Sequence, residues 1–489
     1  MTTGGPGYSI SRRIGELAAA RPDEIAYRTV APSGEETAVS RAEIDRRSGE
    51  LAAAFASRGL GYGDRLSIAL KNSPQFLFAT LAAWKLGAVP VPMRWDLPEW
   101  ELSRLRHAID GKLHIAVEDL DWMDATVGDE VPVLPDVVSP QMYGICSGGS
   151  TGFPKVIMNN RPGTVGSGVS TPFAELWGRR IARPQRICVL GPMYHANAFG
   201  TLYQFLEGDH LVVMEQFDAA RIAEAVERHR ITGFHCTPTM LKRIADLPGI
   251  DDRDLSSLEW ILQGAAPMPP SLVRRWCELI GPENLLMAYG MSENLGIVAL
   301  NGVEWANHEG SVGKPRRGTE VRILDGDQRE VPTGEIGEIY LRSPAYGGST
   351  YLGDASPLPS TPDGFRSAGD LGHLDGDGYV YLVDRRVDMI VTGGANVYPA
   401  EVESALIDHP KVADVVVIGL KDPEWGRRVH ALVAPKDPAD PPTLAEIRDY
   451  AKGRVAAYKA PHSIEVLDRI PRSEATKINR GALVQERGG

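Results

Sequence analysis

The sequence predicts an α/β protein with a large N-terminal part, in which helices cover sheets, then a β-rich segment, then a small α/β unit. Three observations predict this class. Helix and strand signals alternate from residue 40 onward, and from Gly318 the signals are mostly alternating strands. The chain has 489 residues, which is too long for one ordinary core, so a large domain and at least one smaller domain are expected.

Composition excludes several classes of protein. The net charge of −12 argues against a nucleic acid or an anionic membrane as partner. The chain contains no basic-then-apolar signal at its start and no uncharged apolar run of about 18 residues, so a soluble, cytoplasmic protein without membrane insertion is expected. The cysteines are scattered, lack metal-ligand spacing and fit small buried side chains of a reduced protein: Cys146, Cys188, Cys236 and Cys277.

Capping signals define two helices near the N-terminus. A capping box of Ser40 and Glu43 opens a helix that ends at Gly59, and Ser73 caps a second helix that Pro74 starts. Apolar runs between and after these helices indicate strands at 65–70, 88–91, 114–117 and 141–146. This alternation predicts a sheet with parallel pairings whose ligands bind at the carboxyl ends of its strands.

The strand at 141–146 leads into a loop that is suited to hold phosphate groups. The loop consists of Ser147, Gly148, Gly149, Ser150, Thr151, Gly152, Phe153, Pro154 and Lys155. Its glycines let backbone N–H groups approach an anion, its hydroxyls add donors, and its lysine adds a positive charge. It is not a Walker A loop, because residues 156–158 indicate a strand instead of a helix after the lysine. A surface turn is the alternative interpretation.

These nine residues resemble the phosphate loop of the adenylate-forming enzymes, the superfamily of acyl-CoA synthetases, peptide-synthetase adenylation domains and beetle luciferases. Every position of Ser/Thr-Gly/Ser-Gly-Ser/Thr-Thr-Gly-x-Pro-Lys is matched. The resemblance implies a mobile C-terminal domain, ATP and Mg²⁺ as cofactors, and an acyl-AMP intermediate. It also implies catalytic roles for Thr151 and Lys155 and nucleotide contacts along the loop.

A polar-aromatic turn at 192–200 follows a strand at 187–190 and contains His195. A lone histidine is more often structural, but the resemblance implies that His195 lines the acyl site beside the carboxylate of the substrate. The peptide-synthetase members of the family carry an aspartate in this region that binds an α-ammonium group. No acidic residue lies between Pro192 and Leu206, so the resemblance implies that an α-amino acid substrate is not expected. Small residues nearby hint at room for a ring. The expected acyl pocket consists of His195, Asn197, His235, Gly264, Gly290 and Gly296.

Two further segments resemble the nucleotide motifs of the family. Gly264, Ala265 and Ala266 match its adenine-side turn. The segment Ala288, Tyr289, Gly290, Met291, Ser292 and Glu293 matches Tyr-Gly-x-Ser/Thr-Glu. The resemblance implies that Tyr289 stacks on adenine, Ser292 donates to the α-phosphate and Glu293 binds Mg²⁺. Met287 stands where many members have Gln or Asn, which puts one polar contact in doubt.

The ribose motif and the domain boundary follow. Asp370 resembles the family's ribose ligand, since a carboxylate can accept from both hydroxyls, and Arg385 resembles a second ribose or phosphate contact. The resemblance divides the chain into a large domain, 1–386, and a small C-terminal domain, 387–489, that rotates between two half-reactions. Val387 occupies the hinge position, where relatives usually have Lys or Asp.

The C-terminal unit is expected to contain strands at 412–420, 429–433 and 464–467 and helices at 401–407 and 443–454. Gly393 and Gly394 match the family's glycine loop, which implies that they line the channel for coenzyme A. Lys477 matches the lysine that bridges the substrate carboxylate and the α-phosphate, and this assigns it a catalytic and nucleotide-binding role. Thr476 replaces the usual glycine before it.

The motifs together predict an ATP-dependent carboxylate ligase that forms acyl-AMP and pyrophosphate and then transfers the acyl group to coenzyme A. One alternative is an amide-forming ligase that passes acyl-AMP to an amine. Another is a silent nucleotide-binding scaffold, which Lys477 and Glu293 argue against, because AMP binding alone needs neither. The expected partners are a small carboxylic acid and coenzyme A or an amine. The expected assembly is a monomer or a homodimer.

Overall fold

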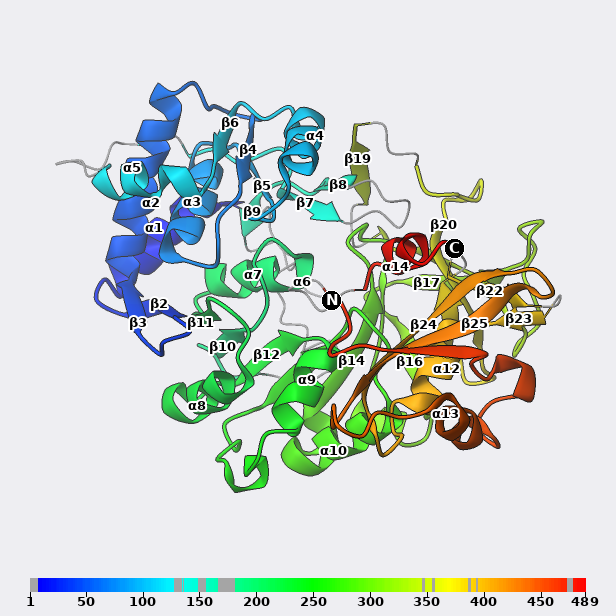
Figure 1. Ribbon diagram of the computed structural model, residues 1–489. Helices are drawn as coiled ribbons and strands as arrows, with labels where there is room; N and C mark the ends of the chain where they lie inside the picture. Colours follow the sequence, from blue (N-terminus) through cyan, green and yellow to red (C-terminus); the bar gives the residue numbers. More distant parts are fainter. Residues whose placement is uncertain are drawn as a thin grey trace.

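The computed structural model defines most of the chain, and for residues 147 and 385 it defines the backbone alone (Figure 1). The described residues are 8–126, 134, 136–147, 155–165, 181–344, 348–353, 357–385, 388–392, 395–472 and 478–489. None of the helices in these ranges is both long enough and apolar enough to cross a membrane.

The largest sheet within these ranges has the strand order β17-β18-β20-β21-β16-β15-β14-β13-β12-β10-β11-β2-β3. Its parallel part consists of β2 (Ile25–Val30), β11 (His210–Met214), β10 (Arg186–Val189), β12 (Gly233–Cys236), β13 (Trp260–Gln263) and β14 (Leu285–Gly290). The remaining strands pair antiparallel: β3 (Glu36–Ser40), β15 (Ile297–Asn301), β16 (Ser311–Arg316), β17 (Glu320–Leu324), β18 (Gly337–Arg342), β20 (Arg366–Leu374) and β21 (Val380–Arg385). Both the parallel pairings and the β-rich segment after Gly318 are therefore confirmed.

Helices cover both faces of the parallel strands, and the residues of β10 show why. Ile187 and Val189 belong to one apolar cluster, whereas Cys188 and Leu190 belong to another, because successive side chains of a strand point to opposite faces. The first cluster includes α1 (Ile10–Ala20), α2 (Arg41–Ser57), α3 (Pro74–Lys85) and α7 (Thr201–Leu206). The second includes α8 (Ala219–His229), α9 (Pro238–Ala245) and α10 (Pro270–Ile280).

The predicted helix starts are confirmed. The Ser40 hydroxyl accepts the Glu43 amide at 3.2 Å before α2, and the Ser73 hydroxyl accepts the Phe76 amide at 3.2 Å before α3, which Pro74 begins. The predicted strands at 65–70, 88–91 and 114–117 form a small parallel sheet of β4 (Arg65–Ile68), β5 (Val89–Pro92) and β6 (Leu113–Ile115). Shorter elements complete this part of the fold: α4 (Glu99–Ile109), α5 (Leu120–Ala125), α6 (Ala196–Phe199), α11 (Gly302–Trp305), β1 (Tyr8–Ser9) and β9 (Thr164–Val165).

The expected location of the phosphate loop needs a correction. The strand-loop-strand prediction is confirmed by β7 (Tyr143–Ser147) and β8 (Lys155–Asn159). These strands do not belong to the parallel sheet, however, but to a small antiparallel sheet of order β19-β8-β7, with β19 at Ser349–Leu352. Only seven residues separate β7 from β8, too few for the crossover of a dozen or more residues that neighbouring parallel strands need, so the chain returns antiparallel.

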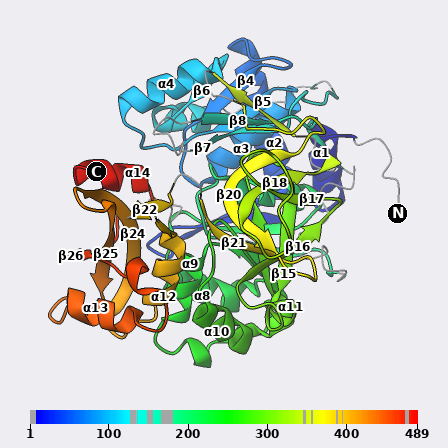
Figure 2. The ribbon, with the colours of Figure 1, turned by 90° about the vertical axis from the view of Figure 1, so that its right-hand side faces the viewer.

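The expected α/β unit at the C-terminus is present (Figure 2). Its strands are β22 (Ile390–Thr392), β23 (Ala395–Val397), β24 (Val412–Asp422), β25 (Gly426–Pro435) and β26 (Ser463–Val466), and its helices are α12 (Pro399–Leu406), α13 (Leu444–Ala451) and α14 (Arg480–Glu486). Val415 and Val417 of β24 belong to a cluster with α12 and α13, whereas Val416 and Ile418 belong to a cluster with α14. The two cores place helices on both faces of this sheet.

Candidate active site

A buried asparagine holds the turn that carries His195. Asn72 is 6% exposed, donates to two backbone carbonyls at 3.0 and 2.9 Å, and accepts the Met193 amide at 2.7 Å. His195 is the N-cap residue directly before α6, and its ring centroid lies 4.5 Å from that of Tyr194. The sequence analysis missed Asn72, although its place directly before the helix cap Ser73, after a buried strand, was a usable signal.

Four of the predicted site residues meet at the carboxyl ends of β12, β13 and β14. The imidazole of His235, in β12, is bonded to the backbone of Asn197 and lies 5.4 Å from the Trp260 ring. Burial lowers the pKa of His235 to about 4, so this side chain is neutral at neutral pH. A Cβ on Gly264 would lie 3.7 Å from the Asn197 side-chain amide and 3.5 Å from the Ala288 carbonyl.

The predicted adenine-side turn is stabilised by the side chain of Gln263, the residue directly before it. The Gln263 side-chain amide donates to the carbonyls of Gly264 and Ala266 at 3.1 and 2.6 Å. Ala265, between them, has a φ of +71°, a backbone conformation that residues other than glycine rarely adopt. Gln263 therefore fixes the backbone of this turn, and the sequence analysis did not identify it.

Tyr289 and Asp370 are brought together from distant parts of the chain. The Tyr289 hydroxyl donates to Asp370 Oδ2 at 2.7 Å, and Asp370 is the cross-strand partner of Arg385 between β20 and β21. The Tyr289 side chain is 9% exposed and packs in the apolar cluster at this end of the sheet. The three predicted contacts to the nucleoside thus converge, although they are separated by up to 96 residues in sequence.

The other residues of the Tyr-Gly-x-Ser-Glu segment follow the end of β14. Gly290 is exposed, and a Cβ there would lie 3.3 Å from the Gly296 carbonyl. Met291 and Ser292 are half-buried. Met287, by contrast, is 5% exposed in the apolar cluster with α8, α9 and α10, so the polar contact that a Gln or Asn would make is absent at this position.

Glu293 and Lys155 meet at Tyr351, which the sequence analysis did not identify. The Tyr351 hydroxyl donates to Glu293 Oε1 at 2.9 Å, and the Lys155 ammonium lies 5.0 Å from the centroid of the Tyr351 ring. The Ser349 hydroxyl donates to the Glu293 carbonyl at 2.6 Å. Burial, followed by the Glu293 carboxylate, raises the pKa of Tyr351, so the hydroxyl keeps its proton as a donor.

Several predicted residues lie outside the described part of the chain. For Ser147 and Arg385 only the backbone positions, in β7 and β21, are described. The residues outside are Gly148, Gly149, Ser150, Thr151, Gly152, Val387, Gly393, Gly394, Thr476 and Lys477.

The residues that flank Lys477 on both sides are tied to the C-terminal unit. Arg472 forms two hydrogen bonds with Asp414, at 2.8 and 2.7 Å. Arg480 forms two with Glu403, at 2.7 and 2.8 Å, and lies 3.4 Å from Asp388. Both ends of the segment that contains Lys477 are thus held by arginine–carboxylate pairs.

Direct bonds join the C-terminal unit to the rest of the protein. The Ala400 amide, in the first turn of α12, donates to Asp384 Oδ2 at 2.9 Å, and the Ser271 hydroxyl of α10 donates to Asp408 Oδ1 at 2.7 Å. The carboxylate at the N-terminus of α12 also interacts favourably with the helix dipole. Asp384 directly precedes Arg385, so this bond anchors α12 beside the predicted ribose contact (Figure 2).

Comparison with known proteins identifies the family. The model of the AMP-binding enzymes matches residues 15–352, and the model of the AMP-binding enzyme C-terminal domain matches residues 401–477. The chain therefore belongs to the AMP-binding, adenylate-forming enzymes, and the resemblance of its motifs is confirmed.

The relatives identify the type of enzyme. A feruloyl-CoA synthase from Amycolatopsis sp. is 34% identical, covering 91% of this chain and 94% of its own, and the 2-succinylbenzoate–CoA ligase of Bacillus subtilis is 30% identical over 93% and 94%. The solved o-succinylbenzoate CoA synthetase of Bacillus subtilis with its acyl-adenylate has a TM-score of 0.81 at 27% identity, covering 96% of this chain and 97% of its own. An amide bond synthetase from Marinactinospora thermotolerans has a TM-score of 0.80 at 25% identity, covering 98% and 99%. The protein is an AMP-forming carboxylate–CoA ligase, which activates its acid as acyl-AMP.

Proposed function

We propose that this ligase converts a ring-bearing carboxylic acid to its coenzyme A thioester. The observation that carries the proposal is Gly264. A Cβ there would make only ordinary van der Waals contacts, so neither packing nor backbone conformation explains the glycine. The missing side chain instead leaves space beside Asn197 and the neutral His235, where a flat acyl group can lie against the backbone.

Two relatives support a ring-bearing acid. Their names specify feruloyl and 2-succinylbenzoate groups as what they act on. In this chain the neutral imidazole of His235 and the carboxamide of Asn197 can form hydrogen bonds to an uncharged polar substituent of a ring. His195 is proposed to orient the reacting carboxylate, with Gly290 and Gly296 on the remaining side.

The nucleoside would be bound by Tyr289 and Asp370, which are joined by a hydrogen bond. Adenine would lie against Tyr289 beside the turn of Gly264 to Ala266, and Asp370 would accept from the ribose hydroxyls. The bond from the Tyr289 hydroxyl orients the Asp370 carboxylate for that purpose. Arg385, its cross-strand partner, would contact the ribose or a phosphate.

The donor set fits magnesium. Glu293 provides a hard carboxylate oxygen, and its bond to Tyr351 occupies Oε1 and leaves Oε2 for a metal ion. Within the described ranges no group of three or more His, Cys, Asp or Glu could hold a metal ion. ATP phosphates are proposed to complete the coordination. When bound, the ion would neutralise charge on the phosphates. Lys155, Ser292 and the loop from Ser147 to Gly152 would donate to them.

The C-terminal unit is proposed to supply different residues to each half-reaction. In the first, Lys477 would stabilise charge between the substrate carboxylate and the α-phosphate as pyrophosphate leaves. In the second, rotation about Val387 would bring Gly393 and Gly394 to the thiol channel, and the thiol would displace AMP. An amine could displace AMP in the same way, which is the amide-forming alternative.

The test combines an acid panel with a glycine variant. Purified enzyme with ATP, Mg²⁺ and coenzyme A should release AMP faster with aryl and arylpropenoic acids than with straight-chain acids. Gly264→Ala should raise KM for the ring-bearing acid by about tenfold, as one misplaced methyl group in a tight site can. Gly15→Ala is the matched control, because a Cβ there would meet nothing within 4 Å. Straight-chain acids as the better substrates would overturn the ring proposal, and faster AMP release with amines than with coenzyme A would overturn the thioester.

A further inference from the structure

Three elements that are far apart in sequence bring an anion and a cation to one tyrosine. Lys155 begins β8, Tyr351 lies on β19, and Glu293 follows β14. Tyr351 is the register partner of Ile157, so Lys155 is its diagonal neighbour on the same face of the antiparallel pair. The ring thus contacts the ammonium, while the hydroxyl at its edge donates to Glu293.

This arrangement keeps apart two groups that would otherwise attract each other. An ammonium and a carboxylate that share a partly buried site favour a direct ion pair. Among the described residues Lys155 forms no ion pair, and its ammonium faces the ring of Tyr351. An aromatic face attracts a cation without neutralising its charge, so the lysine remains available for phosphate.

We propose that Tyr351 is a positioning residue for both charges of the phosphate site: its hydroxyl orients Glu293 toward magnesium, and its ring prevents Lys155 from pairing with Glu293. The proposal rests on the proposed function in that Glu293 is taken as the magnesium ligand. Hydrogen bonds to a metal-binding carboxylate commonly control metal affinity.

The backbone of Glu293 does not depend on the Tyr351 hydroxyl for its position. The Ser349 hydroxyl already bonds the Glu293 carbonyl, so the backbone at this point is fixed by another residue. The Tyr351 hydroxyl therefore acts on the side chain of Glu293 specifically. Arg366 bonds the Ser349 carbonyl at 3.5 Å and supports the same strand.

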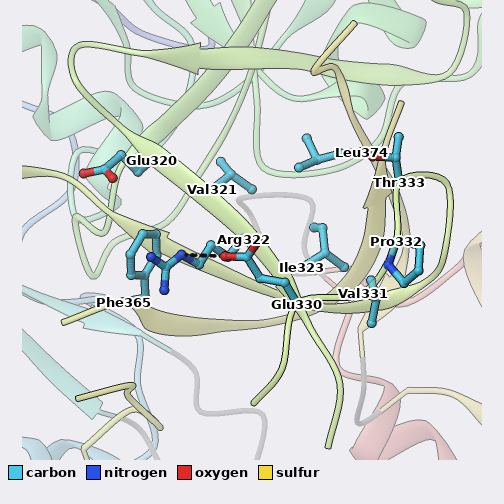
Figure 3. A pocket seen from close by; sticks show the side chains of 10 residues that line it. All are labelled: Glu320, Val321, Arg322, Ile323, Glu330, Val331, Pro332, Thr333, Phe365 and Leu374. Atoms are coloured by element: carbon cyan, nitrogen blue, oxygen red, sulfur yellow. Dashed lines mark ion pairs between the residues drawn. The ribbon is translucent and has the colours of Figure 1, made fainter. Parts of the chain in front are cut away.

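A cavity over β17 offers no rival site. Within the described ranges, a cavity of about 410 Å³ lies over β17, where Arg322 pairs with Glu330 at 2.9 Å (Figure 3). Arg322 also pairs with Asp363, at 2.8 Å. The guanidinium also stacks 4.1 Å from the centroid of Phe365. The charges of Arg322, Glu330 and Asp363 thus compensate one another.

The experiment measures ATP binding by calorimetry, once with Mg²⁺ and once with EDTA, and needs no acid substrate. Tyr351→Phe keeps the ring and should weaken Mg·ATP binding by about tenfold while changing metal-free binding by less than about twofold. Tyr351→Leu also removes the ring and should weaken metal-free binding, because Lys155 can then pair with Glu293. Adding Glu293→Gln to Tyr351→Leu should restore metal-free binding.

Tyr381→Phe is the matched control, because its hydroxyl donates to Asp375 at 3.2 Å and Tyr381 lies on β21 of the large sheet, not on the sheet that carries Tyr351. It should bind ATP like the wild type under both conditions. Wild-type affinity of Tyr351→Phe for Mg·ATP, or an equal loss with and without metal, would overturn the proposal. Wild-type enzyme that binds Mg·ATP but exchanges no pyrophosphate with any acid would instead refute the proposed function.

Discussion

Removal of the Arg480 guanidinium should weaken the C-terminal unit in a pH-dependent way. Arg480 follows the segment that contains Lys477 and joins Glu403 of α12 to Asp388, next to the proposed hinge. Glu403 Oε1 also accepts the Val417 amide at 2.7 Å. The variant Arg480→Met keeps most of the apolar stem of the side chain and removes the charge.

The expected magnitude follows from burial. Removing one partner of a buried ion pair costs about 3–5 kcal/mol, because it leaves an uncompensated charge. The side chains of Arg480 and Glu403 are 21% and 19% exposed, so the lower end of that range, about 3 kcal/mol, applies. In a local opening equilibrium this energy corresponds to a factor of about 10².

The pH dependence has a definite sign. Burial raises the pKa of Glu403 above its usual 4.5, and the charge of Arg480, followed by the Val417 amide and Arg472, opposes that rise. A carboxyl group with a raised pKa stabilises the folded state most when protonated, and the contribution is lost as pH rises through the folded pKa. Without Arg480 the folded pKa rises further. The variant should therefore be nearly normal at about pH 5.5 and destabilised at about pH 8.

Hydrogen exchange measures this directly. The slow amides of β24 and α12 should lose about 10² in protection at about pH 8 and much less at about pH 5.5, after correction for intrinsic rates. Arg342→Met is the matched control, because Arg342 makes an equally close double contact with Glu320 at the surface, at 2.9 and 2.7 Å. Equal losses at the two pH values, or the same loss in the control, would refute the argument.

Two further predictions concern the nucleotide. Lys477→Ala should slow acyl-AMP formation, measured by pyrophosphate exchange, by about 10²- to 10³-fold. It should leave thioester formation from preformed acyl-AMP nearly unchanged. An equal loss in both half-reactions would contradict the role of Lys477. Tyr289→Phe removes the bond to Asp370 and should raise KM for ATP by about tenfold with little change in kcat, as expected for a bond to a charged group. An unchanged KM would show that Asp370 needs no such orientation.

Local signals determined most of the fold that the sequence could predict. Caps such as Ser40 and Ser73 and the apolar periodicity of β10 depend on near neighbours, so they are visible in a single sequence. The pairing of β8 with β19 was not visible in this way, because β19 lies about 190 residues further along the chain. That pairing decides the location of the phosphate loop, which is why the expected parallel sheet was wrong there.

The same distinction applies to the site. Motif residues such as Tyr289 and Asp370 were predicted individually, and the structure brings them within 2.7 Å of each other. The supporting residues Asn72, Gln263 and Tyr351 were missed. Asn72 and Tyr351 act on groups that only the fold brings near, whereas Gln263 bonds carbonyls one and three residues further along the chain. Of the three, Asn72 had a local signal, namely its place directly before the helix cap Ser73.

The two carboxylates proposed to bind ligands each accept a hydrogen bond from a tyrosine hydroxyl, and this neutral donor leaves their negative charge available for the ligand. Glu293 accepts from Tyr351 at 2.9 Å, and Asp370 accepts from Tyr289 at 2.7 Å. An arginine or lysine in place of either tyrosine would compensate the carboxylate's charge and compete with magnesium or with the ribose hydroxyls. A neutral phenol orients the carboxylate and preserves its charge. Because the chain has a net charge of −12, the cations proposed to bind phosphate, such as Lys155, must likewise remain unpaired with carboxylates, and the aromatic contact to Tyr351 is proposed to achieve this.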